Sequence, residues 1–169
     1  MRSTIGIDVA APPDLVFALA RDVERWPRLL PHYVAATRLA PPDDQGRLIV
    51  RFVARRVLLP VLGLGVPVAW RSLTWSDPTT LRLRFVHRGG ATNGMDVTWH
   101  IRLASGTAGT TRVDIEHVFA PRLPGWAPLI DRLFTRPIAG RTLATFRDLA
   151  ETLASARTSD RAPLTNPST

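Results

Sequence analysis

Between residues 33 and 119 the sequence alternates apolar and polar residues in short segments that end at turn-forming residues. In residues 47–56, RLIVRFVARR, apolar side chains occupy the even positions from 48 to 54, and three arginines occupy odd positions. Residues 81–88 and 95–103 follow the same pattern. Because successive side chains of a strand point to opposite faces, each segment predicts a strand with one apolar face. Short strands joined by tight turns indicate an antiparallel meander, which constrains the fold more than any other feature.

About six strands are expected in this region, and one more precedes it. Their predicted ranges are 3–11, 34–39, 47–56, 66–76, 81–88, 95–103 and 111–120. Pro12 and Pro13 suit the first turn of a helix that runs to about Arg21. A second short helix follows and ends before Pro31. Two short helices are therefore expected between the first strand and the meander.

A long helix is predicted from Pro124 to about Arg157, where apolar residues recur at spacings of three and four. Pro137 and Gly140 are expected to kink or interrupt it. The element order predicts an α+β domain over residues 1–157, in which a curved antiparallel sheet wraps around this helix. Such an arrangement tends to leave a ligand-binding cavity between sheet and helix. The polar residues 158–169 are expected to be a disordered tail.

The composition excludes several kinds of chemistry. The chain has no cysteine, so disulfides, thiolate metal sites and cysteine nucleophiles are absent. The net charge of +8 comes from arginine alone, because the sequence has no lysine. The use of arginine can indicate a surface that faces anions, or it can reflect a GC-rich coding bias that replaces lysine with arginine. The arginines are scattered and form no nucleic-acid motif, so a nucleic-acid partner is not expected. No secretory signal or membrane span is visible, which favours a cytoplasmic protein.

Four segments resemble motifs of the START-like helix-grip superfamily, or SRPBCC proteins, which includes polyketide aromatase/cyclases and coenzyme Q-binding proteins. These segments are VFALARDVERWPRLLPHY (16–33), VAWRSLTWSDP (68–78), NGMDVTWHI (93–101) and FRDLAETLA (146–154). The resemblance covers roughly residues 3–155. It implies a helix-grip fold and an apolar ligand in the cavity, but the superfamily hosts binding, transport and catalysis alike.

One departure from this resemblance concerns the strand that begins at Trp70. In the aromatase/cyclases this strand carries an arginine that points into the cavity, and by position that residue is Thr74 here. Arg71 does not replace it, because odd and even positions face opposite sides of a strand. The loss of this cation weakens the case for cyclising a polyketone, whose enolate intermediates need electrostatic stabilisation.

Alternation places a set of side chains on the inward face of the sheet, where they are candidates for contact with a ligand. They are Trp70, Ser72, Thr74, Phe85, His87, Met95, Trp99, His117 and Phe119. The aromatic residues and the methionine are expected to form the cavity wall. His87 and His117 are weak candidates for a general base or for orienting a polar ligand group. The alternative is a pair of buried histidines satisfied by backbone or water.

Other polar residues are not expected to react. Asp96, His100, Asp114 and Glu116 fall on the outward face, and nothing fixes an aspartate to a histidine beside Ser72 as a triad needs. The inward histidines have no adjacent carboxylate, so neither a metal nor a cofactor is expected. His32 and Tyr33, at the start of the second strand, are expected at a polar rim.

The apolar segment Val57–Pro67, flanked by Arg55, Arg56 and Arg71, has three interpretations. It can contact an anionic membrane surface, cover the cavity as a lid, or mediate contact in a homodimer; a monomer is the alternative state. The function expected overall is binding or carriage of a hydrophobic small molecule such as a lipid, quinone, isoprenoid or polyketide-like aromatic. The alternative is a polyketide cyclase or dehydratase that uses His87 or His117, with Ser72 or Thr74 as polar partners.

Overall fold

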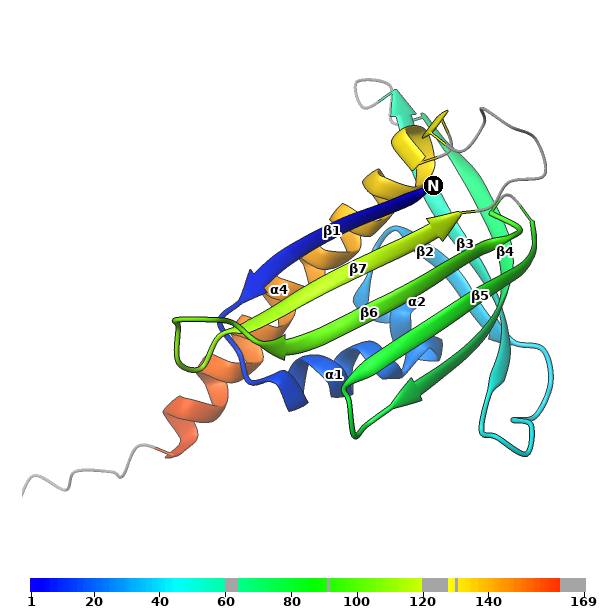
Figure 1. Cartoon of the computed structure of the whole chain (residues 1–169). Helices are drawn as coiled ribbons and strands as arrows, with labels where there is room; N and C mark the ends of the chain where they lie inside the picture. Colours follow the sequence, from blue (N-terminus) through cyan, green and yellow to red (C-terminus); the bar gives the residue numbers. More distant parts are fainter. Residues whose placement is uncertain (60–63, 91, 120–127, 130, 162–169) are drawn as a thin grey trace, which may run out of the picture.

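The computed structural model contains one seven-stranded antiparallel sheet in the order β1-β7-β6-β5-β4-β3-β2. It describes residues 1–59, 64–90, 92–119, 128–129 and 131–161. The sheet curves around the long helix α4 (Figure 1). The strands are β1 (Arg2–Val9), β2 (Tyr33–Arg38), β3 (Leu48–Leu59), β4 (Leu64–Asp77), β5 (Arg82–Gly90), β6 (Met95–Leu103) and β7 (Thr111–Phe119). The predicted α+β helix-grip architecture is confirmed.

Short helices follow β1, a π-helical turn follows the last strand, and a long helix ends the described chain. They are α1 (Pro13–Arg21), the 3₁₀ turn η1 (Val23–Arg25), α2 (Trp26–Leu29), the π-helical turn η3 (Asp131–Thr135) and α4 (Arg136–Arg161). Within the described ranges, none of the helices combines the length and apolar character needed to cross a bilayer.

The long helix differs from its prediction at both ends. α4 begins at Arg136, directly after η3, and continues to Arg161, four residues beyond the predicted end. The change from π to α geometry falls just before Pro137, which lacks the N–H that would bond back to the preceding turn. Gly140 does not interrupt the helix: a Cβ there would lie 3.4 Å from Ile5 Cδ1, so its small size suits close packing on β1. The predicted tail from residue 162 onward lies outside the described residues.

The segment Val57–Pro67, predicted as an apolar loop, consists largely of paired strand. β3 and β4 pair as far as Leu59 and Leu64, so the connection shortens to residues 60–63, which lie outside the described residues. The sequence predicted a loop here because proline and glycine residues usually mark loops and turns.

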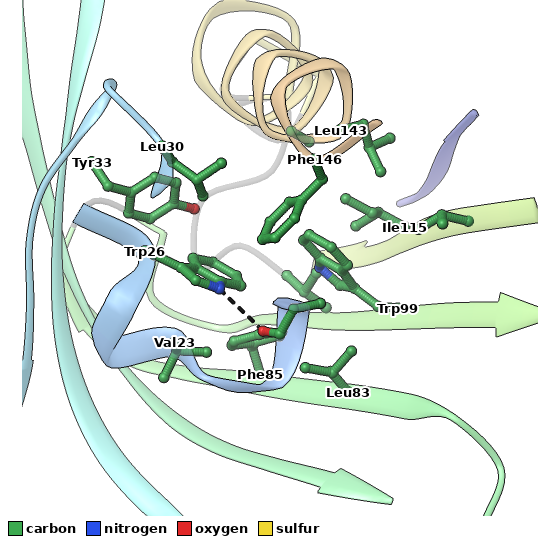
Figure 2. Packing of buried hydrophobic residues seen from close by; sticks show 14 of the residues in the cluster. Val23, Trp26, Leu30, Tyr33, Leu83, Phe85, Trp99, Ile115, Leu143 and Phe146 are labelled. Carbon is green, nitrogen blue, oxygen red and sulfur yellow. Dashed lines mark hydrogen bonds between the residues drawn. The ribbon is translucent and has the colours of Figure 1, made fainter. Parts of the chain in front are cut away.

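One face of α4 packs against the inner face of the sheet. Ala139, Leu143, Phe146 and Ala150 are buried, and their spacings of four, three and four residues place them on one side of the helix. Figure 2 shows Leu143 and Phe146 directed toward Trp99 and Ile115 on the sheet. The inward side chains of the strands and this face of α4 therefore share one core.

Trp26 of α2 lies at the centre of this core (Figure 2). Its ring centroid is 5.1–5.9 Å from the rings of five aromatic neighbours: Tyr33, Phe52, Phe85, Trp99 and Phe146. Its indole Nε1 donates a hydrogen bond to the Ala20 carbonyl oxygen at 3.1 Å. The donor is thus satisfied while the ring is buried, as a core tryptophan requires. Through this one side chain α2 holds sheet and terminal helix together.

Candidate functional site

A cavity of about 70 Å³ lies between the inner face of the sheet and the start of α4. Six aromatic rings form much of its wall: Trp26, Tyr33, Phe52, Trp70, Phe85 and Trp99. Val68, Met95, Val97, Ile115, Ile138 and Ala139 complete the apolar lining. A space of this size would hold a handful of waters or a small ring system, since one water needs about 15 Å³ of such volume. The site therefore suits a compact apolar molecule.

Most of the predicted contact residues line this cavity, and three do not. Trp70, Phe85, His87, Met95, Trp99 and His117 are on its wall. Ser72, Thr74 and Phe119 are buried on the same face of the sheet but are not part of the lining. The Ser72 hydroxyl instead donates to the Leu73 carbonyl oxygen at 3.3 Å. Thr74, which stands at the arginine position of the resemblance, is thus removed from the cavity altogether.

The sequence did not single out several lining residues. Trp26 falls in the second short helix predicted before Pro31, and nothing local in the sequence indicates that its ring reaches the cavity. Thr92 belongs to the turn between β5 and β6, and Thr135 ends η3, so neither position follows the alternation that predicted the wall. Phe52 was predicted to face inward, and inspection of that strand could have added it to the site.

Four polar side chains are among the lining residues of the cavity, and we call them its polar end: His87, Thr92, His117 and Thr135. His87 Nδ1 and the Thr92 hydroxyl are 2.6 Å apart and hydrogen-bonded. His117 Nδ1 and the Thr135 hydroxyl oxygen are buried and have no hydrogen-bond partner among the residues that the structure describes. Buried polar atoms without partners are costly, so these two atoms mark where a ligand's polar group would be favoured.

Burial keeps both cavity histidines neutral near pH 7. Burial, with a smaller contribution from the neighbouring His117, lowers the pKa of His87 to about 3, while a hydrogen bond with the Thr92 backbone opposes the change. Burial likewise lowers the pKa of His117 to about 4, with Asp131 opposing and Arg136 adding to the effect. The polar end is therefore uncharged and offers neutral donors and acceptors.

Asp131 anchors the segment that contributes Thr135. Its carboxylate is mostly buried and accepts hydrogen bonds from Ser3 Oγ at 2.9 Å and Arg136 Nε at 3.1 Å. Ser3 lies on β1 directly opposite His117 of β7. This contact joins η3 to the edge of the sheet and fixes one side of the polar end.

His32 and Tyr33 do not form the polar rim that was expected. His32 is 3% exposed, and its Nε2 lies 2.8 Å from the Thr142 hydroxyl. The same hydroxyl also donates to the Ile138 carbonyl oxygen at 2.8 Å within α4. Burial lowers the pKa of His32 to about 4, and Arg141 adds to this. His32 thus ties the corner before β2 to α4, while Tyr33 is buried against the cavity and its burial raises the pKa of the phenol.

The remaining polar candidates lie where the sequence predicted. His100 and Glu116 are half-buried on the outward face, with His100 Nε2 3.6 Å from a Glu116 oxygen. Asp114 pairs there with Arg102 and Arg112. Among the described residues no three histidine or carboxylate side chains come together as a metal site.

The chain is similar to known proteins over most of its length. A Streptomyces halstedii protein provisionally named a polyketide cyclase is 36% identical over 95 residues, or 55% of this chain and 80% of that protein. The crystal structure of the Zhui aromatase/cyclase from Streptomyces sp. R1128 has a TM-score of 0.71 at 19% identity, covering 89% of this chain and 93% of its own. A START superfamily protein from Mycobacterium smegmatis has a TM-score of 0.64 at 15% identity, covering 92% and 98%.

The curved sheet around a terminal helix, with a cavity between them, defines the START-like helix-grip class. The sequence profile of the family described as polyketide cyclase / dehydrase and lipid transport matches residues 2–155. The chain therefore belongs to this family, and the resemblance found in its sequence motifs is confirmed.

Proposed function

We propose that this protein binds and carries a compact, mostly apolar small molecule in the cavity under α4, with one uncharged polar group at the end formed by His117 and Thr135. The observation that carries the proposal is the aromatic wall combined with two buried polar atoms that lack partners. Aromatic walls bind ring compounds well, and a few placed polar groups fix their orientation. A ligand hydroxyl or carbonyl that reaches either atom would give it the hydrogen bond it lacks.

The low basicity of the histidines favours binding over catalysis. A general base works best when its pKa lies near the working pH. With pKa values of about 3 and 4, His87 and His117 are much weaker bases than free imidazole. No cation is among the described lining residues, so an enolate would gain little stabilisation there. A neutral imidazole is nonetheless a good hydrogen-bond partner for a ligand.

Extraction of the purified protein with organic solvent, followed by mass spectrometry, tests the proposal. Wild-type protein is expected to release a defined apolar compound. Ala139 lines the cavity from α4, so Ala139→Phe would fill the space from the helix side. The folded variant should release none. Equal amounts of the same compound from both proteins would show that it binds elsewhere and would refute the proposal.

A second candidate is cyclisation or dehydration of a polyketide-like substrate, with His117 or His87 as proton carrier. The likeness to a protein named as a polyketide cyclase and the two neutral cavity histidines support it. A turnover assay on a poly-β-ketone, repeated with His87→Ala and His117→Ala, separates the candidates. If wild-type protein turns the substrate over and both variants do not, although they still bind ligand, the result favours an enzyme. If wild-type protein shows no turnover, the result favours binding without catalysis.

A further inference from the structure

The outward face of the sheet carries two halves that differ in their charge pairing. On β1, β7 and β6, arginines meet carboxylates: Arg2 lies 2.8 Å from Glu116, Arg102 lies 2.6 Å from Asp114, and Arg112 bridges Asp8 and Asp114. Strands β3, β4 and β5 contain a single carboxylate, Asp77, whose oxygens bond to Thr79 and Thr80 in the next turn. These three strands therefore supply no carboxylate that pairs with their own arginines, and Asp96 of the neighbouring strand β6, opposite Val86, forms no ion pair with them among the described residues.

Six exposed arginines lie on β3, β4 and β5, and none has an ion-pair partner among the residues that the structure describes: Arg51, Arg55, Arg71, Arg82, Arg84 and Arg88. We call this surface the basic face. Arg51 and Arg71 are direct neighbours on β3 and β4. Like charges placed opposite each other destabilise a sheet. Positions that break such a rule without compensation inside the molecule are often functional.

Two of these arginines extend over glycines of adjoining strands. A Cβ on Gly65 would lie 2.8 Å from Arg55 Cγ and Nε, and one on Gly89 would lie 3.3 Å from Arg71 Nε. The missing side chains leave room for both guanidinium groups to lie against the sheet. Arg71 extends toward β5, on the side of β4 away from Arg51, so its guanidinium lies over the sheet between β4 and β5.

Exposed aliphatic side chains border the same arginines. Leu39 and Ile49 are 47% and 43% exposed, and the Leu39 N–H bonds to the Ile49 carbonyl oxygen at 2.8 Å. By strand alternation Ile49 shares its face with Arg51. The basic face thus combines guanidinium groups with apolar surface, and the one carboxylate beside it among the described residues of β6 is Asp96, opposite Val86 at the β5 edge.

We propose that the basic face is a docking surface for an anionic phospholipid membrane. Arginine binds phosphate oxygens in bidentate fashion, and the adjacent aliphatic side chains would lie at the headgroup boundary. A second copy of the chain fits poorly, because a symmetric contact would bring arginines against arginines. An acidic protein would satisfy the charge but not the leucine and isoleucine. The proposal stands apart from ligand binding, since the cavity lies on the other face of the sheet.

Cosedimentation with vesicles tests this surface. The probes are vesicles of phosphatidylcholine alone and vesicles in which about a third of it is replaced by phosphatidylglycerol. The protein is expected to bind only the second kind, and less tightly as salt is raised. Because each arginine near an anionic leaflet strengthens binding about fivefold, the triple variant Arg51→Gln, Arg55→Gln, Arg71→Gln should bind on the order of 100-fold more weakly.

A matched control removes the same charge elsewhere: Arg2→Gln, Arg102→Gln and Arg147→Gln, three arginines that are ion-paired with carboxylates. This control should keep most of the wild-type membrane binding, and circular dichroism should show both variants folded. If the two triple variants lost vesicle binding equally, net charge alone would explain the binding, and the proposal would be overturned. So would a soluble polyglutamate that binds the basic face more tightly than anionic vesicles do in the same salt, since that result would assign the face to an acidic protein.

Discussion

Three buried histidines make the stability of this protein depend on pH in a definite direction. His32, His87 and His117 have pKa values of about 4, 3 and 4 in the fold, against 6.5 ordinarily. Between pH 4 and 6.5 the unfolded chain therefore binds more protons, and the free energy of unfolding rises with pH. The histidine contribution is fully present above about pH 6.5 and is lost as pH falls toward 4.

At pH 5 each buried histidine should lower the free energy of unfolding by on the order of 1–2 kcal/mol relative to pH 7.5. Urea unfolding at the two pH values measures this. Asp43 and Asp77 have pKa values lowered below 3.8, so their effect falls below the same window. His117→Gln should reduce the pH dependence by about one histidine's share. Equal stability at pH 5 and pH 7.5 would contradict the assignment of neutral buried histidines.

Trp26 is expected to be one of the most sensitive single positions. Trp26→Ala would remove a buried ring that contacts five others and should cost about 3–5 kcal/mol. Trp75 is a matched control, because it is half-buried on the outward face under the Arg84 guanidinium, 5.1 Å from its ring. Trp75→Ala should cost about 1 kcal/mol. Similar losses for the two variants in urea unfolding would show that Trp26 does not hold the core.

At the scale of elements, η3 connects the terminal helix to the sheet through Asp131. Asp131→Asn removes the negative charge of the carboxylate that accepts hydrogen bonds from Ser3 and Arg136. Since Asp131 raises the pKa of His117, this variant should move that pKa below its value of about 4, as NMR titration would measure. Ser3→Ala keeps the carboxylate and should leave the His117 pKa nearly unchanged. A His117 pKa that stays constant in Asp131→Asn would mean that η3 does not act on the polar end.

The elements predicted best were those with a clear period. The range 95–103 agrees with β6, Met95–Leu103, because its inward positions alternate without exception. The terminal helix was predicted from Pro124, whereas α4 itself begins at Arg136, after helical residues at 128–129 and the π-helical turn η3. Apolar spacings of three and four cannot distinguish an α-helix from the π-helical η3 that precedes it, and residues 120–127 lie outside the described ranges. Pro137 marks the place where the hydrogen-bond pattern changes.

The part of the site that lies on strands could be predicted because strands have a clear period. Alternation identified the wall residues on strands, including His87 and His117, because every second side chain of an inward strand must point at the cavity. Trp26 and Thr135 come from a short helix and a π-helical turn, where no period indicates direction. Their place depends on how those elements pack onto the sheet, which is a property of the whole chain.

At the scale of the whole molecule, the sheet, the short helices and the terminal helix enclose one aromatic space with a polar end, which we propose is the ligand site. Its most direct test is calorimetric titration with naphthalene and 2-naphthol, which differ only in a hydroxyl. The hydroxyl can bond to His117 Nδ1 or Thr135 Oγ1, so 2-naphthol should bind about tenfold more tightly than naphthalene.

Thr135→Val should reduce that preference, and Ala139→Phe should abolish binding of both compounds in a folded protein. If the cavity is the ligand site, calorimetry should give saturable binding of 2-naphthol to wild-type protein and none to Ala139→Phe. Absence of binding to wild-type protein, or equal binding to the filled variant, would contradict it.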